Sequence, residues 1–233
     1  GDAKSQVGRF RTAPADGAMT PLRMAVASCQ RWDQGLFTAY EHMAREELDL
    51  VAHLGDYIYE YSSPANAIRK HQGLEIRTLD DYRRRYAQYK TDPALQAAHQ
   101  RAPWVVTWDD HEVDNNYANL RGENEMESTD QMRVRRAAAY QAWWEHQPVR
   151  VPRVTSWADL SITRTINWGA LARFWMLDTR QYRDIQPCDS GTKPVPCGEW
   201  ADPKRQLMGA AQEQWLFSGL AASKSHWQVL GQH

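Results

Sequence analysis

The chain has 233 residues, 42% of them hydrophobic, and a formal net charge of -1, which suits one large domain or one domain with added pieces. This near-neutral charge gives no electrostatic case for nucleic acid or an anionic membrane as partner. No apolar run approaches the ~18 residues of a transmembrane helix. The sequence also lacks a Gly-x-Ser-x-Gly elbow and a phosphate-cradling glycine-rich loop, which argues against a serine hydrolase and a nucleotide enzyme.

In residues 1–21 the sequence predicts a strand followed by a linker. Val7–Thr12 alternate like a strand, and Ala13–Gly17 have the composition of a linker. We expect this strand to be the last one of a module that begins earlier.

A βαβ unit is predicted after this linker. Met24–Ser28 form a short buried strand that ends at Cys29. Phe37–Glu47 have helical spacing, and Leu50–Leu54 form the next strand, closed by a glycine before Asp56. Such a unit makes its strands parallel, so Cys29 and Asp56 should be neighbours at the carboxyl edge of the sheet.

Two helices and a third strand follow. Leu79–Tyr89 form the first helix, in which Arg83–Arg85 point in different directions, so a solvated face is favoured over an anion site. Asp before Pro starts a second helix that runs to about Arg101. The strand Trp104–Trp108 then stops at a polar cluster, Asp109–Asn116.

The second half of the chain predicts a helix, an antiparallel strand pair, another helix and a last strand. These are Met132–Glu145, Ser161–Asn167 with Leu171–Leu177, Ala210–Ala222 and Trp227–Leu230. The chain stops just after the last strand, where another loop of the site should begin. We therefore expect it to be a piece of a longer polypeptide.

The cysteines are of two kinds. Cys188 and Cys197 flank a loop containing Gly and Pro that a disulfide would close easily in an oxidising compartment, although two unpaired thiols remain an alternative. Cys29 is left over at a strand end, where it is a candidate ligand or nucleophile.

Polar residues follow several strands: Cys29, Asp56 with Tyr59, Asp109–Asn116, Asp178 with Arg180, and Gln232 with His233. Carboxylate, phenolate, thiolate and amide ligands suit a hard metal pair better than structural zinc. Arg180 could bind the phosphate of a substrate, and His111 could protonate a leaving oxygen or steer the nucleophile. Each residue also has a structural alternative: a packing cysteine, a turn aspartate, a solvated loop, or an Arg180 paired with Asp178 or Asp184.

Four motifs together resemble the PhoD family of secreted alkaline phosphatases and phosphodiesterases, which includes phospholipase D-type members and belongs to the calcineurin-like metallophosphoesterases. The motifs are Ser28-Cys29-Gln30, Gly55-Asp-Tyr-Ile-Tyr-Glu60, Trp108-Asp-Asp-His-Glu-Val113 and Asp178-Thr-Arg-Gln-Tyr-Arg183. The resemblance implies Fe³⁺ with Ca²⁺, with Cys29 and Tyr59 as iron ligands and Asp56 as the bridge.

The calcium ligands remain open between two pairs of neighbours. Either Asp109 or Asp110, and either Asn115 or Asn116, is implied; Asp110 and Asn115 are the predicted pair. Gln232 matches a family position that faces the metals, and His233 stands where a second glutamine is frequent in the family.

The resemblance also implies the fold and the activity. Residues 1–21 would be the end of an N-terminal β-sandwich domain with its linker, and residues 22–233 would form the N-terminal half of a four-layered α/β/β/α metallophosphoesterase domain. A metal hydroxide would hydrolyse phosphomonoesters or phosphodiesters outside the cytoplasm, with His111 and Arg180 stabilising charge. In the family, a further half of the domain carries additional Asp and His ligands. A companion polypeptide would supply them here. The alternative is a non-catalytic half-domain that binds a partner or a phosphorylated ligand.

Overall fold

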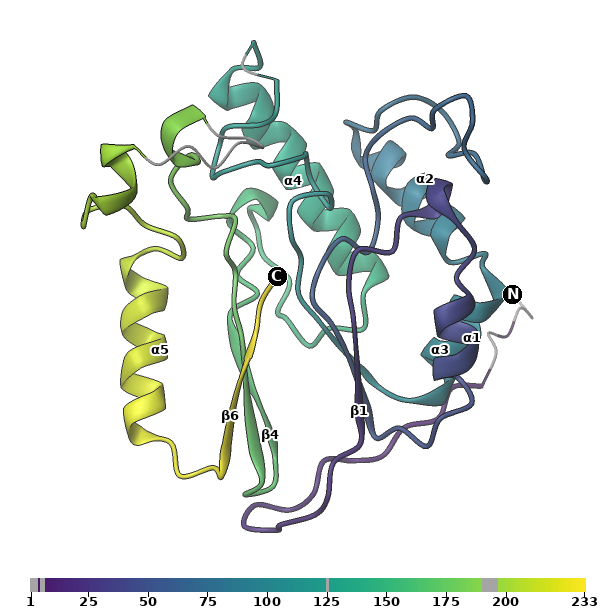
Figure 1. Cartoon of the computed structure of the whole chain (residues 1–233), viewed down its shortest axis with the longest axis vertical. Coiled ribbons are helices and arrows are strands. Elements are labelled where there is room, and N and C mark those ends of the chain that lie inside the picture. The colour runs from purple at the N-terminus through teal and green to yellow at the C-terminus, as the bar shows by residue number, and fades with distance from the viewer. Residues whose placement is uncertain (1–3, 5–6, 125, 190–196) are drawn as a thin grey trace.

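Four layers build the structure, a computed structural model that describes residues 4, 7–124, 126–189 and 197–233. Two sheets pack face to face: helix α5 covers the outer face of the sheet β4-β5-β6, and the other α-helices cover the outer face of the sheet β1-β2-β3 (Figure 1). The predicted α/β/β/α arrangement is confirmed.

The first sheet is parallel throughout the described residues and has the order β1-β2-β3. Its strands are β1 (Met24–Ala27), β2 (Leu50–His53) and β3 (Trp104–Val106). Its outer side carries α1 (Thr38–Met43), α2 (Leu79–Tyr89), α3 (Pro93–Arg101) and α4 (Thr129–His146). Every residue of β2 and β3 is buried, as expected for parallel strands covered on both faces.

The second sheet is mixed and has the order β4-β5-β6. β4 (Arg164–Trp168) runs antiparallel to β5 (Ala172–Met176), and β6 (Trp227–Gly231) runs parallel to β5. Helix α5 (Ala210–Ala222) packs on its outer face through a cluster around Trp175. Short 3₁₀ helices occupy Trp32–Gln34, Trp157–Asp159, Pro187–Asp189 and Gly198–Ala201.

An apolar cluster between the two sheets fixes how they face each other. It contains Leu50, Val105, Trp168, Ala172, Phe174 and Met176. Two polar contacts extend it: Thr107 Oγ1 donates to the carbonyl of Leu177 (2.8 Å), and Arg164 Nη2 donates to that of Val106 (2.6 Å). Burial of apolar surface and these bonds therefore hold the carboxyl edge of the first sheet against the second.

Local signals in the sequence set the ends of three helices. Thr78 and Asp81 form a capping box at the start of α2, and Ser128 and Gln131 form another at α4. Asp92 accepts two backbone N–H bonds at the start of α3, whose first residue is a proline.

The expected strand at Val7–Thr12 is wrong. Residues 7–12 form no strand, and Val7 and Phe10 are exposed, because no strand among the described residues pairs with this segment; Arg9 N donates to the carbonyl of Gln100. The assignment of 1–21 to a β-sandwich domain stays a prediction, and residues 1–3 and 5–6 lie outside the described part. No helix among the described residues is long and apolar enough to cross a membrane.

Candidate active site

The loops that follow β1 and β2 lie side by side, as the βαβ pattern predicts. Cys29 N donates to the carbonyl of Gly55 and Gln30 N to that of Asp56, both at 3.1 Å. Cys29 and Asp56 have φ values of 55° and 56°, in the left-handed region that non-glycine residues seldom adopt. Such backbone strain is typical of sites where side chains must be aimed at one point.

Gly55 permits the loop after β3 to approach the same point. Its φ is 120°, and a Cβ here would lie 2.6 Å from the backbone nitrogen of Asp109. Only glycine fits this approach, which places Asp109 against the loop that carries Asp56.

Glu112 ties these loops together. Its carboxylate is buried and accepts backbone N–H bonds from Asp56 (3.1 Å), Tyr57 (2.6 Å) and Asp109 (2.8 Å). Sequence reasoning missed this role, because an acidic residue in an acidic cluster gives no sign that it bonds to backbone 56 residues away.

Asp56 is a buried carboxylate with one oxygen satisfied. Tyr59 donates its hydroxyl to Oδ2 at 3.0 Å, whereas Oδ1 has no partner among the described residues. Burial, followed by the charge of Asp109, raises the pKa of Asp56 despite the opposing charge of His111. A buried, unpaired carboxylate oxygen is costly unless a cation satisfies it, so this oxygen fits a metal ligand.

Two groups of candidate ligand atoms share Asp56. Cys29, Asp56 and His233 form one group and Asp56, Asp110 and His111 the other, with the atoms of each group within 4.8 Å of one another. Thiolate, imidazole and carboxylate are all metal ligands, so each group could hold a metal ion, and Asp56 is common to both.

His111 is positioned by Glu60. Its Nδ1 lies 2.8 Å from the buried Oε2 of Glu60, and its ring lies over Tyr59 with centroids 4.1 Å apart. Burial opposes the imidazolium, but the hydrogen bond and charge of Glu60 outweigh it and raise the pKa of His111 to about 9. Glu60 thereby favours the imidazolium form of His111.

Arg180 reaches from the second sheet to Asp109. Its Nε and Nη2 donate to the two oxygens of Asp109 at 2.6 and 2.9 Å, and Nη2 lies 3.3 Å from Asp110. Neither expected structural partner pairs with this guanidinium; Asp178 instead accepts the backbone N–H of Arg180 (3.0 Å). Nη1 is buried without a partner among the described residues.

The two neighbouring aspartates have opposite protonation tendencies. Burial would raise the pKa of Asp109, but hydrogen bonds from His233, Asp110 and Arg180 hold it well below its usual range. Burial and the neighbouring Asp109 raise the pKa of Asp110 to about 7. Asp109 thus forms ion pairs with Arg180 and His233. Asp110 lies beside Asp56 and His111.

His233 enters the site from the end of β6. Nε2 lies 3.0 Å from Cys29 Sγ, and Nδ1 lies 2.7 Å from Asp109 Oδ2. The hydrogen bond to Asp109 raises the pKa of His233 to about 10. The sequence placed His233 after a strand without indicating that its ring reaches the first sheet.

A family model for PhoD-like phosphatases matches residues 24–233. The chain belongs to the PhoD-like phosphatase family. It is 51% identical over 238 aligned residues to alkaline phosphatase D of Bacillus subtilis (strain 168), covering all of this chain and 40% of that protein. A solved structure titled "Structure of PhoD" matches with a TM-score of 0.92 and 52% identity, over 97% of this chain and 44% of that one. The chain thus spans well under half the length of these PhoD relatives.

The other residues predicted as metal ligands are Asn115, with Asn116 as its alternative, and Gln232. Asn115 donates through its backbone to Glu60 (2.7 Å) and through its side chain to Glu123 (2.7 Å), while Asn116 N donates to Asp110 (2.6 Å). Gln232 is exposed beside His233. Ligation by Asn115 and Gln232 stays a prediction.

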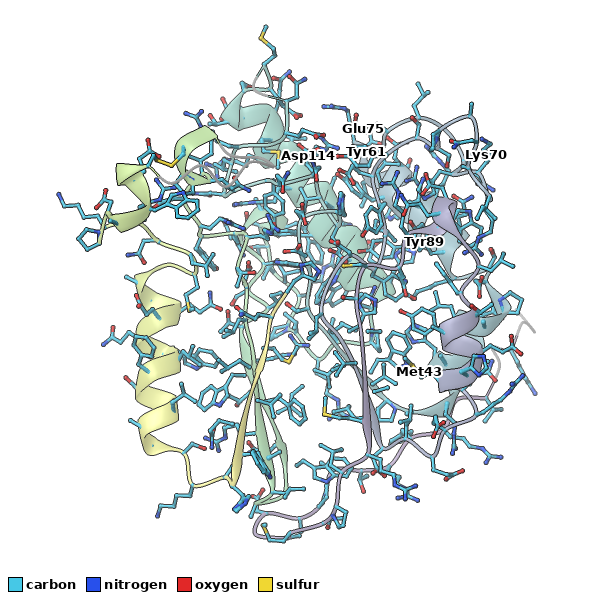
Figure 2. The ribbon with its side chains drawn as sticks, in the orientation of Figure 1. Met43, Tyr61, Lys70, Glu75, Tyr89 and Asp114 are labelled. Atoms are coloured by element: carbon cyan, nitrogen blue, oxygen red, sulfur yellow. A yellow bond between two sulfur atoms is a disulfide. The ribbon has the colours of Figure 1, made fainter. Side chains whose placement is uncertain are left out.

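An ionic network around the buried Arg135 supports this side of the PhoD-like site. Arg135 of α4 lies 2.9 Å from both Asp114 and Glu75, and Tyr61 donates to Glu123. Tyr61, Glu75 and Asp114 gather near the ends of α2 and α4 (Figure 2). The network fixes the loops that carry Glu60 and Asn115.

The solvated face expected for Arg83–Arg85 is wrong for one of the three residues. Arg84 is exposed, but Arg85 is buried and donates to the carbonyls of Tyr59 and Tyr61. The helix turns this guanidinium inward, where unpaired loop carbonyls need donors. Arg85 thereby holds the loop that presents Tyr59.

The predicted disulfide between Cys188 and Cys197 is confirmed, and Cys29 is the free cysteine. Residues 190–196 of the enclosed loop lie outside the described part. Disulfides form and persist in oxidising compartments, in keeping with an extracytoplasmic protein.

Proposed function

We propose that the native-length protein containing this chain is a metal-dependent phosphoric ester hydrolase. The observation that carries the proposal is the buried Asp56, which has an unsatisfied Oδ1 and belongs to both groups of candidate ligand atoms. Membership of the PhoD-like phosphatase family supports this proposal over the non-catalytic binding module.

The proposed ligand sets share Cys29, Asp56 and Asp110 with these two groups. Cys29, Tyr59 and Asp56 would hold Fe³⁺, and Asp56, Asp110 and Asn115, with Gln232, would hold Ca²⁺. Asp110 is preferred over Asp109, because Asp109 already pairs with Arg180 and His233. When bound, such a metal pair polarises phosphate oxygens and supplies a nucleophilic hydroxide near neutral pH.

The arginines of the second sheet would bind the phosphate group. Arg180 is oriented by Asp109 and keeps Nη1 without a protein partner, and Arg183 Nε is likewise buried and unpartnered among the described residues. Burial, followed by the charge of Arg180, lowers the pKa of Arg183. An anionic substrate would relieve both unsatisfied donors, which suits a phosphate ester.

His111 would act as the proton donor. Glu60 occupies Nδ1, which leaves Nε2–H available to protonate the leaving oxygen of the ester. Glu60 also holds the ring over Tyr59, so the donor cannot swing away from Asp56. Arg180 and protonated His111 would together stabilise the negative charge of the transition state.

The second part of the site would come from a further polypeptide segment. The chain spans 40% of the Bacillus subtilis relative, and its β1 and β6 strands expose Val26 (58%), Trp227 (62%) and Leu230 (47%). These apolar side chains would contact the remaining half of the domain, which supplies the other ligands. The disulfide supports a location outside the cytoplasm.

Turnover and metal content test this function together. The native-length protein should hydrolyse an aryl phosphomonoester or diester, and Asp56→Asn should lower the rate at least ~100-fold and deplete iron and calcium in elemental analysis. Asp130→Asn, an exposed exchange on α4, is the matched control. Metal-loaded protein without turnover on either ester would overturn the proposal, as would an Asp56→Asn variant that retains both rate and metal. Comparing these esters with phosphatidylcholine distinguishes phosphatase, phosphodiesterase and phospholipase D activity.

A further inference from the structure

His233 bridges the two sheets at the centre of the site. It follows β6 of the second sheet, yet its ring lies between Cys29 and Asp109, which follow strands of the first sheet. The end of β6 lies between the sheets at the same edge as the end of β1 (Figure 1). The chain thereby brings an imidazole from one sheet to a thiol from the other.

The two ring nitrogens have different tasks. Arg180 stabilises the ionised form of Asp109 through two hydrogen bonds. Oδ2 of this carboxylate accepts a hydrogen bond from Nδ1–H of His233. Nε2 then points at Cys29 Sγ, 3.0 Å away. Histidines that bind metals characteristically donate their other N–H to a carboxylate in this way.

Without a metal ion, Nε2 of His233 and Sγ of Cys29 would share a hydrogen bond, which satisfies only these two atoms. Asp56 belongs to the same group, and its buried Oδ1 would remain without a partner among the described residues. A cation at the centre of Cys29, Asp56 and His233 satisfies all three residues at once. The unsatisfied carboxylate oxygen therefore favours a metal ion over a shared proton.

Nε2 of His233 and Sγ of Cys29 lie close enough together, at 3.0 Å, for one cation to contact both atoms.

We propose that His233 Nε2 is a further ligand of the metal ion held by Cys29 and Asp56, and that Asp109 is the positioning residue that orients it. The inference rests on the proposed function, since it concerns the same metal site. It assigns Asp109 a place outside the coordination sphere. It also links the phosphate-binding Arg180 to the metal through one carboxylate.

Metal binding tests the assignment apart from turnover. Native-length protein loaded with Fe³⁺ is compared with His233→Ala and with His226→Ala, an exposed histidine before β6. Competition with a chelator should show at least ~10-fold weaker iron binding in His233→Ala, with a shifted thiolate-to-iron absorption band. Pulsed electron paramagnetic resonance should show one coordinated imidazole nitrogen fewer in His233→Ala than in the wild type, and no change in His226→Ala.

A second variant separates ligation from positioning. Asp109→Asn should retain the nitrogen signal but weaken iron binding, because the ring keeps Nε2 and loses its charged anchor. If the wild type binds iron and turns over ester while His233→Ala keeps the same iron affinity, absorption band and nitrogen signal, the His233 assignment falls and the proposed function stands. If the wild type binds no metal and hydrolyses no ester, both fall.

Discussion

His53 should make the stability of this protein fall sharply with acid. It is fully buried in β2, between Trp104 (centroids 5.9 Å apart) and Tyr57 (5.2 Å), and its Nε2 has no partner among the described residues. Burial, followed by the charges of His99 and His233, lowers the pKa of His53 from 6.5 to about 3. The unfolded chain thus binds one more proton than the folded protein between these two values.

The free energy of unfolding contributed by this group is therefore fully present above pH 6.5 and is lost as the pH falls toward 3. At pH 5 the loss amounts to about 2 kcal/mol, since each pH unit within the window costs about 1.4 kcal/mol. A glutamine at this position does not titrate. The substitution also changes packing, which shifts the free energy of unfolding by the same amount at every pH. Only the pH dependence of the difference between wild type and His53→Gln therefore measures proton uptake by His53.

Urea unfolding followed by tryptophan fluorescence measures this difference, with EDTA present at every pH so that metal binding does not contribute. The free-energy difference between wild type and His53→Gln should shrink by about 2 kcal/mol from pH 8 to pH 5. His42→Gln, at an exposed histidine of α1, controls for the exchange itself. Parallel stability curves for wild type and His53→Gln would refute the reasoning, because they would mean that His53 takes up its proton equally in both states.

Two further substitutions test the supports of the site. Arg85→Met should destabilise the protein by about 3 kcal/mol in the same urea assay, because it leaves the carbonyls of Tyr59 and Tyr61 unpaired; Arg84→Met, on the exposed side of α2, should cost less than about 1 kcal/mol, and equal effects would contradict the assignment. Replacing Cys188 and Cys197 by serine should cost about 2–3 kcal/mol by freeing the closed loop. Thermal unfolding with and without reductant checks this second value: reductant should lower the melting temperature of the wild type only.

Local patterns predicted most of the elements. Helix α2 lies at its predicted residues, because its capping box and apolar spacing act within a few positions of the chain, and helix α5 also lies where it was predicted. The βαβ pattern also placed Cys29 beside Asp56, since the hand and direction of such a unit leave few alternatives. A local sequence pattern does not show whether a neighbouring strand is present to pair with a segment. The strand expected at Val7–Thr12 was wrong for this reason.

The partners of the site residues were the part that the sequence left open. Glu112 bonds to backbone nitrogens of a distant loop, Glu60 anchors His111, and Arg85 turns inward to loop carbonyls. Each of these roles depends on which charged side chain the tertiary fold buries. A charged residue in a polar stretch is usually solvated, so composition alone favours the wrong outcome for Arg85.

Asp109 shows why the geometry of this site depends on both sheets. Its backbone is fixed in the first sheet through Glu112 and the close approach at Gly55, whereas its carboxylate holds Arg180 and His233 of the second. A shift of one sheet against the other would therefore move the guanidinium of Arg180 and the imidazole of His233 away from Cys29 and Asp56 together. The apolar cluster between the sheets consequently acts on the chemistry as well as on stability, because it sets the distance across which this one carboxylate must reach.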